Sequence, residues 1–165
     1  MVKITEEKQS SGKSKDEIPR LTLRSTLITG FPGETEKDFR ELSDFVSEGW
    51  FDHLGVFEYR SLDGTRSSGL PGAVDAGTAR ERKKEIMTRQ KKVVAMRYAS
   101  MKGRTVEVLV ESAKGENAAA GRAIFQAPEI DGGMIIDGSC VKGSFVKVKI
   151  TGYKGYDLKG ELVSK

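Results

Sequence analysis

A short segment at residues 27–35, with the sequence LITGFPGET, has the residue types of a ligand-binding turn. Its apolar start is typical of a β-strand, and the Gly-Pro-Gly turn that follows leads into a helix. Because glycine has no Cβ, the backbone of such a turn can approach a small ligand closely. An acidic side chain directly after the turn could reach a polar group of that ligand. We therefore expect a small-molecule site where this strand ends, formed by Gly30, Phe31, Pro32, Gly33 and Glu34.

The elements around this turn form a predicted βαβ unit. Strands are expected at residues 21–29 and 53–59, with a helix between them that begins at Thr35, has Asp38 as a capping acid and ends at Gly49. Apolar residues recur along this helix at helical spacing and predict its buried stripe, which consists of Phe39, Leu42, Phe45 and Val46. The two strands should be parallel, with a right-handed crossover.

A loop at residues 60–77 separates this unit from a long basic helix. Thr78 and Glu81 have the spacing of a capping box, and the helix is expected to close at Gly103. Residues 78–102 contain nine Lys or Arg and two Asp or Glu, whereas residues 21–77 contain five and ten. The favoured interpretation is a solvated helix lying against the acidic segment before it. Binding of nucleic acid or another acidic surface is the alternative.

After Gly103 the apolar pattern changes from helical spacing to alternation. Short strands separated by Gly-rich turns are expected at five places, namely residues 105–111, 121–126, 133–137, 144–151 and 157–163. Five short strands in about 60 residues indicate a small closed β-barrel. We place the domain boundary at Gly103.

Several of these segments resemble one known family. Residues 27–35 are similar to the fifth strand of the radical-SAM barrel in methylthiotransferases, where GFPGET recurs beside S-adenosylmethionine. Residues 103–111, 143–151 and 156–163 resemble a TRAM domain. The resemblance implies an α+β chain, in which a partial radical-SAM (β/α) barrel precedes a five-stranded, OB-like TRAM barrel. The predicted parts are a disordered leader (1–18), the barrel remnant (19–77), the basic linking helix (78–102) and the TRAM domain (103–165).

The hexapeptide APEIDG at residues 127–132 resembles the RimO-type branch of this family. Residues 23–28 and 51–59 resemble RimO strands, although the YRSL sequence at 59–62 departs from the Tyr-Ser-Pro that the family usually has. RimO-type enzymes methylthiolate an aspartate in the twelfth protein of the small ribosomal subunit, which is a basic protein. The resemblance thus implies that an acidic loop carrying Glu129 and Asp131 binds this partner. The alternative is that the hexapeptide only shapes a turn.

The resemblance also implies S-adenosylmethionine and [4Fe–4S] clusters as cofactors. The turn residues Gly30 to Glu34 would line the adenosine side of S-adenosylmethionine. The chain has a single cysteine, Cys140, and no CxxxCxxC, so it cannot supply the thiolates of a cluster. We expect Cys140 and the single histidine, His53, to be structural, and Trp50 and Phe51 to lie in the core. No catalytic or metal residue is predicted, and the chain alone is expected to be inactive, with the N-terminal part of the enzyme as its missing partner.

Two other functions remain open. One is a stand-alone TRAM module that binds ribosomal protein or RNA, and the other is the tRNA-directed, MiaB-type branch, which APEIDG argues against. RNA is the less favoured ligand because residues 103–165 contain nine Lys or Arg and eight Asp or Glu, so clustered cations are lacking. No apolar run approaches the length of a membrane span, and a single cysteine favours the cytoplasm.

Overall fold

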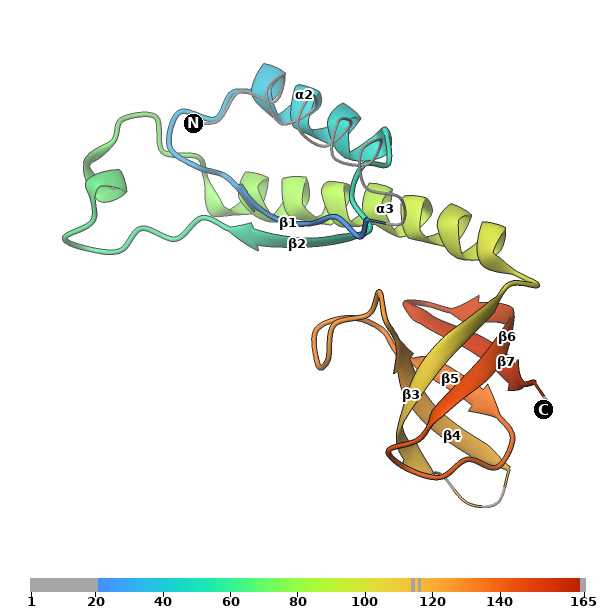
Figure 1. Ribbon diagram of the computed structural model, residues 1–165. Coiled ribbons are helices and arrows are strands. Elements are labelled where there is room, and N and C mark those ends of the chain that lie inside the picture. Colours follow the sequence, from blue (N-terminus) through green and yellow to red (C-terminus); the bar gives the residue numbers. More distant parts are fainter. Residues whose placement is uncertain (1–20, 114, 116, 164–165) are drawn as a thin grey trace. The chain divides into compact units, whose positions relative to one another are not determined.

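The computed structural model describes residues 21–113, 115 and 117–163 (Figure 1). The chain divides into two compact units between Val93 and Val94, and helix α3 (Ala76–Met101) contributes to both. The first is called the sheet unit and the second the barrel unit. The α+β class is confirmed. The predicted leader at residues 1–18 lies outside the described residues.

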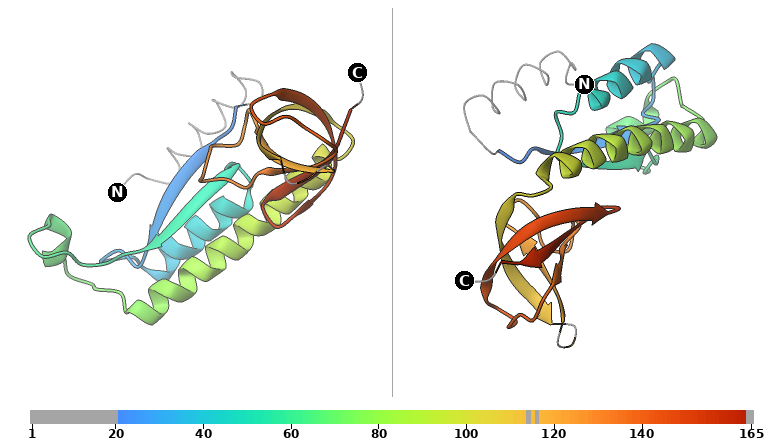
Figure 2. Two further views of the ribbon diagram at one scale, coloured as in Figure 1. Left: turned by 90° about the horizontal axis from the view of Figure 1, so that it is seen from below. Right: turned by 90° about the vertical axis from the view of Figure 1, so that its right-hand side faces the viewer.

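The sheet unit has the predicted βαβ order. Strand β1 (Arg24–Thr29) and strand β2 (His53–Glu58) are parallel, with Leu27 opposite Val56, and helix α2 (Glu36–Ser47) connects them. The loop before α3 contains the short 3-10 helix η1 (Arg66–Gly69). The two strands lie side by side in the left view of Figure 2.

The two helices begin differently from each other. The capping box of α2 is confirmed, because the Thr35 hydroxyl accepts from the Asp38 N–H and the Asp38 carboxylate accepts from the Thr35 N–H. The capping box predicted at Thr78 is wrong, since α3 already begins at Ala76. The Asp75 carboxylate accepts from Gly77 N–H (2.7 Å), Thr78 N–H (3.0 Å) and the Thr78 hydroxyl. These bonds hold the pKa of Asp75 below its ordinary value.

The core of the sheet unit lies on one face of the two strands. Phe39 and Val46 from α2 and Ile86 from α3 pack there against Val56 and Leu27. The other face carries Ile28 opposite Phe57, and both side chains are exposed. Among the described residues, helices thus cover one face of this sheet, whereas parallel sheets usually have both faces covered.

The barrel unit is a closed five-stranded barrel with the strand order β3-β4-β5-β7-β6, in which β5 and β7 are parallel and the other pairs antiparallel. The strands are β3 (Thr105–Ala113), β4 (Ala118–Ala123), β5 (Met134–Asp137), β6 (Phe145–Lys154) and β7 (Asp157–Leu162). Strand β4 lies three residues before its predicted position. Inward-facing apolar side chains from all five strands fill the barrel, and Val94 and Tyr98 of α3 join this core.

Candidate ligand-binding turn and partner-binding loop

The glycine-rich turn begins directly after β1 and packs closely on α3. Gly30 and Gly33 have φ values of +78° and +84°, which glycine adopts without a steric penalty. A Cβ built on Gly30 would lie 2.4 Å from the Cβ of Ala79, whereas one on Gly33 would meet nothing within 4 Å. Gly30 is therefore needed for packing, and Gly33 leaves open space beside the turn.

Glu34 closes this turn from within the chain. Its Oε2 accepts from the Gly30 N–H at 2.9 Å, and its Oε1 accepts from Arg82 Nη1 at 2.7 Å. The exposed fractions of the Glu34 and Arg82 side chains are 11% and 9%. From the sequence we expected this carboxylate to contact a polar group of a ligand. Instead, the structure shows both of its oxygens engaged within the chain, where they fix the position of the turn.

Arg82 is a residue of this site that the sequence analysis missed. Its Nη1 also donates to the Glu34 carbonyl (3.3 Å), its Nη2 donates to Glu36 (3.3 Å), and its guanidinium lies 5.2 Å from the centre of the Phe39 ring. The bond from Arg40, and then that from Arg82, lowers the pKa of the Glu36 carboxylate. The basic character of residues 78–102 was the available signal, but it did not single out one arginine.

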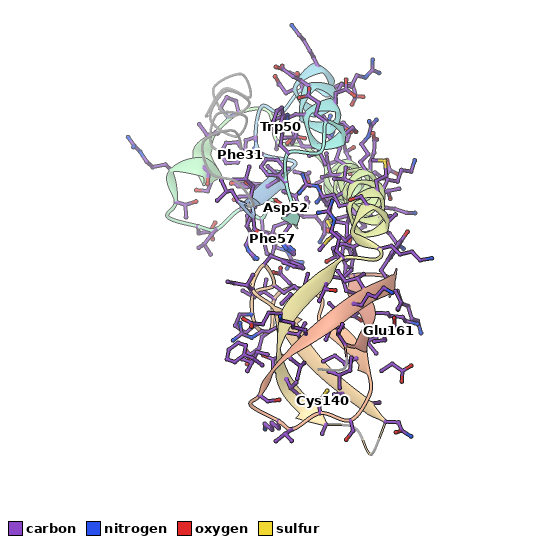
Figure 3. All side chains as sticks on the ribbon, turned by 45° about the vertical axis from the view of Figure 1, so that its right-hand side comes forward. Phe31, Trp50, Asp52, Phe57, Cys140 and Glu161 are labelled. Atoms are coloured by element: carbon purple, nitrogen blue, oxygen red, sulfur yellow. The ribbon has the colours of Figure 1, made fainter. Side chains whose placement is uncertain are left out.

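The other side of the turn presents an aromatic pair. The Phe31 and Tyr59 rings pack edge to face with their centres 5.2 Å apart, and Phe31 is partly exposed. The Tyr59 hydroxyl is buried and has no hydrogen-bond partner among the described residues. Phe31 is labelled in Figure 3. The turn thus carries a partly exposed aromatic ring, with a buried and unpartnered hydroxyl behind it.

The chain does not fit an iron–sulfur cluster. It has one cysteine, Cys140, which is partly buried against the barrel core, as expected for a packing residue (Figure 3). Within the described ranges no three His, Cys, Asp or Glu side chains are grouped as metal ligands. His53 lies half-buried on β2, and its N–H donates to the Leu23 carbonyl. Phe51 is in the core, whereas Trp50 is only half-buried.

The basic helix lies against acidic residues of the sheet unit, as the favoured interpretation predicted. Lys83 contacts Glu58 of β2 at 3.2 Å, and Arg89 contacts Asp44 of α2 at 3.5 Å. Together with the Arg82 pair, these contacts use three of the cations of α3 inside the unit.

The predicted partner-binding residues lie on the loop at residues 124–133, between β4 and β5. The Asp131 carboxylate accepts from the Ala127 N–H at 2.7 Å and so helps to close the loop. Glu129 is exposed and has a φ of +63°, in the left-handed region. A Cβ on Gly132 would lie 1.8 Å from the Tyr156 carbonyl oxygen. Asp131 and Gly132 therefore shape the turn, and Glu129 presents its charge to solvent.

Gln126, which the sequence analysis treated as the end of a strand, organises the same loop. It is 2% exposed; its Oε1 accepts from the Ala123 N–H, and its Nε2 donates to the Gly132 and Gly133 carbonyls. The Gln126 amide thus satisfies backbone groups of the loop that would otherwise pair with a neighbouring strand.

Comparison with known proteins defines the class of the barrel unit first. Residues 103–163 match the family model of the TRAM domain. The barrel unit therefore has the sequence of a TRAM domain, and a βαβ unit precedes it in the chain.

Comparison with whole proteins is more specific. The chain is 40% identical over 90% of its length to the ribosomal protein uS12 methylthiotransferase RimO of Syntrophomonas wolfei, and 44% identical over 92% to that of Anaeromyxobacter sp. strain K. It spans 34% and 33% of the lengths of these two relatives. By sequence the chain is therefore similar to about one third of the length of RimO-type ribosomal protein methylthiotransferases.

Other comparisons add less. A solved multidomain protein from Streptococcus pneumoniae with nucleic acid binding domains covers 39% of this chain at 14% identity and a TM-score of 0.31, a similarity too low to support an argument. No helix in the described part of the chain has the length and apolarity of a membrane span.

Proposed function

We propose that this chain provides two parts of a ribosomal protein aspartate methylthiotransferase. The turn from Gly30 to Glu34 contacts the adenosine side of S-adenosylmethionine, and the TRAM barrel holds the ribosomal protein uS12. The observation that carries the proposal is the turn itself, which lies at the carboxyl end of a parallel strand with Phe31 exposed and the Tyr59 hydroxyl unpartnered. Ligands of parallel sheets characteristically bind at these strand ends.

Residues of the turn and its neighbours have separate roles in this proposal. The backbone of Gly33 allows close approach, Phe31 packs against the adenine, and the Tyr59 ring supports the Phe31 ring edge to face. Glu34 and Arg82 hold the turn in place through their buried ion pair. S-adenosylmethionine, when bound, would supply the methyl carbon of the methylthio group, and the sulfur atom would have to come from another source. Since the chain has one thiol, the cysteines of the iron–sulfur clusters would have to come from another segment.

The acidic loop of the barrel supports the choice of partner. Glu129 is exposed beside Asp131, and a ribosomal protein that binds RNA is basic, so the charges are complementary. Residues of opposite charge across an interface steer encounter and select partners more than they raise affinity. The loop would thus orient uS12 rather than take part in the chemistry.

A chimera tests the proposal. Residues 21–163 would replace the matching third of the Syntrophomonas wolfei relative, and mass spectrometry would detect methylthiolation of uS12 after anaerobic reconstitution. We expect a modified aspartate, and for Phe31→Ala a KM for S-adenosylmethionine raised about tenfold with little change in kcat. A chimera that folds and binds its clusters but leaves uS12 unmodified would disprove the proposed function.

The isolated chain provides the complementary measurement. After anaerobic reconstitution it should contain no stoichiometric iron and release no 5′-deoxyadenosine, because a single thiolate cannot ligate a cluster. Cluster absorbance in stoichiometric amount would contradict this expectation.

RNA binding by the TRAM unit is a second candidate. The exposed Phe145 lies on the outside of the barrel on the same strand as Lys147 and Lys149, an arrangement that can stack and neutralise a single strand. However, Lys147 is paired across the strands with Glu107, and Lys149 lies 3.7 Å from Glu161. Affinities for tRNA and uS12 measured at one salt concentration would separate the two candidates.

A further inference from the structure

We infer that the loop at residues 124–133 docks a basic protein segment through two isoleucine anchors, Ile124 and Ile130, beside the charge of Glu129. The identity of the partner rests on the proposed function, whereas the surface and its chemistry come from the barrel unit itself. The sequence alone had indicated only the two carboxylates of this loop, those of Glu129 and Asp131, as partner-binding groups.

The isoleucines are the most exposed apolar side chains of this loop. Their exposed fractions are 99% for Ile124 and 77% for Ile130. Apolar β-branched side chains at this degree of exposure gain nothing for folding. Two such side chains on one ten-residue loop offer apolar surface to a partner, and apolar anchors that become buried carry much of the free energy of binding.

The loop that carries them is held in one conformation. Gln126 bonds to the backbone at both sides of the loop, at Ala123 and at Gly132 and Gly133. Asp157 Oδ1 accepts from the Gly133 N–H at 2.8 Å, and the backbone of Gly132 packs directly on Tyr156. A surface fixed before binding loses little conformational entropy when a partner docks.

The charge of the loop selects the partner. Between Arg122 and Lys142 the sequence contains no Lys or Arg, but it contains Glu129, Asp131 and Asp137. Nucleic acid would meet only negative charge here, and its binding depends on cations. A basic protein segment with an apolar side chain is complementary in both charge and surface chemistry.

The backbone conformation of Glu129 also supports a role in contacting the partner. Its φ of +63° is unfavourable for a residue with a Cβ and free for glycine. Glutamate at this position therefore lowers folding stability relative to glycine, while it places a carboxylate next to Ile130. Strained residues of this kind occur preferentially at functional sites.

The test compares variants of the full chain for binding to purified uS12, by fluorescence anisotropy at one stated salt concentration. The double variant Ile124→Ser/Ile130→Ser should bind about tenfold or more weakly. The matched control is Val141→Ser, because Val141 is another β-branched residue of the barrel unit, 76% exposed and on a different connection. It should bind within about twofold of wild type.

Glu129→Gly keeps the inference testable independently of folding. It should be at least as stable as wild type and yet bind uS12 more weakly, and Glu129→Lys should weaken binding further, because like charges then meet across the interface. Circular dichroism would verify that each variant is folded.

The outcomes separate the two proposals. If wild type binds uS12 and the double isoleucine variant binds equally well, or no worse than Val141→Ser, the docking surface is wrong and the proposed function stands. If wild type does not bind uS12, both proposals fail. Loss of tRNA binding instead of uS12 binding in the isoleucine variant would also overturn the inference.

Discussion

The Glu34 carboxylate and the Arg82 guanidinium are separated by 48 residues of sequence but lie 2.7 Å apart, and both side chains are about nine-tenths buried. The same carboxylate accepts from the Gly30 N–H. One ion pair therefore connects the glycine-rich turn with helix α3. The position of the proposed ligand-binding backbone therefore depends on a residue of α3, outside the turn.

The first prediction concerns this pair. Arg82→Met should lower the unfolding free energy of the sheet unit by about 3 kcal/mol, because it leaves Glu34 buried without its partner. Arg40→Met is the matched control. Arg40 pairs with Glu36 at 3.0 Å, but the exposed fractions are 75% and 59%, so the loss should be much smaller than for Arg82→Met. Urea unfolding followed by Trp50, the only tryptophan and a residue of the sheet unit, would measure both. Similar losses in the two variants would mean that the buried pair contributes no more than the exposed one.

A second prediction compares two glycines of the turn. Both have positive φ, so alanine costs about 1–2 kcal/mol at each in backbone strain. Gly30→Ala also places its Cβ against Ala79, which should add about 1–3 kcal/mol, whereas Gly33→Ala meets nothing within 4 Å. Thermal unfolding monitored by Trp50 should show the larger loss for Gly30→Ala. Equal losses would indicate that α3 moves away from the turn at little cost.

The sequence predicted those parts of the fold that local patterns specify. The βαβ order followed from the apolar stripe of α2 and the Thr35–Asp38 cap, and the barrel followed from alternating residues between Gly-rich turns. Two local predictions were wrong. Asp75 is as good a cap as Thr78 and precedes it, and the apolar Ile124 and Phe125 resemble strand residues more than Ala118 and Ala119 do. Strand pairing overrode this weak preference in β4.

The candidate site was less predictable than the fold. The turn from Gly30 to Glu34 was located by its glycines, but the engagement of Glu34 by Arg82 was not, because no periodicity connects residues in a turn and a distant helix. Similarly, the acidic residues of the loop were visible in APEIDG, whereas the exposure of Ile124 was not. A β-branched apolar residue such as Ile124, directly after β4, suggests that the strand continues. The strand ends at Ala123 because the Gln126 side chain bonds to the backbone of Ala123 and Gly132.

The third prediction concerns pH. Burial, followed by the nearby Asp131 and Asp157 and then Tyr156, raises the pKa of Tyr98 to about 12. The unfolded chain has an ordinary tyrosine pKa of about 10. The stability that neutral Tyr98 contributes is therefore fully present below about pH 10 and is lost as the pH rises towards about 12. Thermal melts of the barrel unit followed by circular dichroism should show this loss.

The variant Tyr98→Phe separates the contribution of Tyr98 to the alkaline loss of stability from that of lysines, which titrate in the same pH range. The variant loses the 3.3 Å hydrogen bond to the Tyr156 carbonyl but should have a flatter decline of melting temperature between about pH 10 and 12. Tyr153→Phe, at a partly exposed ring that packs on Tyr98, should keep the wild-type decline. A wild-type decline in Tyr98→Phe would show that other groups cause the alkaline loss.

The last prediction compares the two units by hydrogen exchange. All five barrel strands have partners on both sides, whereas within the described residues β1 and β2 pair only with each other and expose Ile28 and Phe57 on the uncovered face. Local opening of β1 and β2 should therefore cost less, and their amides should exchange at least about tenfold faster than those of β3 and β6. In the chimera with the Syntrophomonas wolfei relative, protection of β1 and β2 should rise while that of β3 stays unchanged, because only the sheet unit gains new partners. Equal protection of both units in the isolated chain would mean that the two helices on one face are sufficient to stabilise the sheet, and that Ile28 and Phe57 need no covering partner.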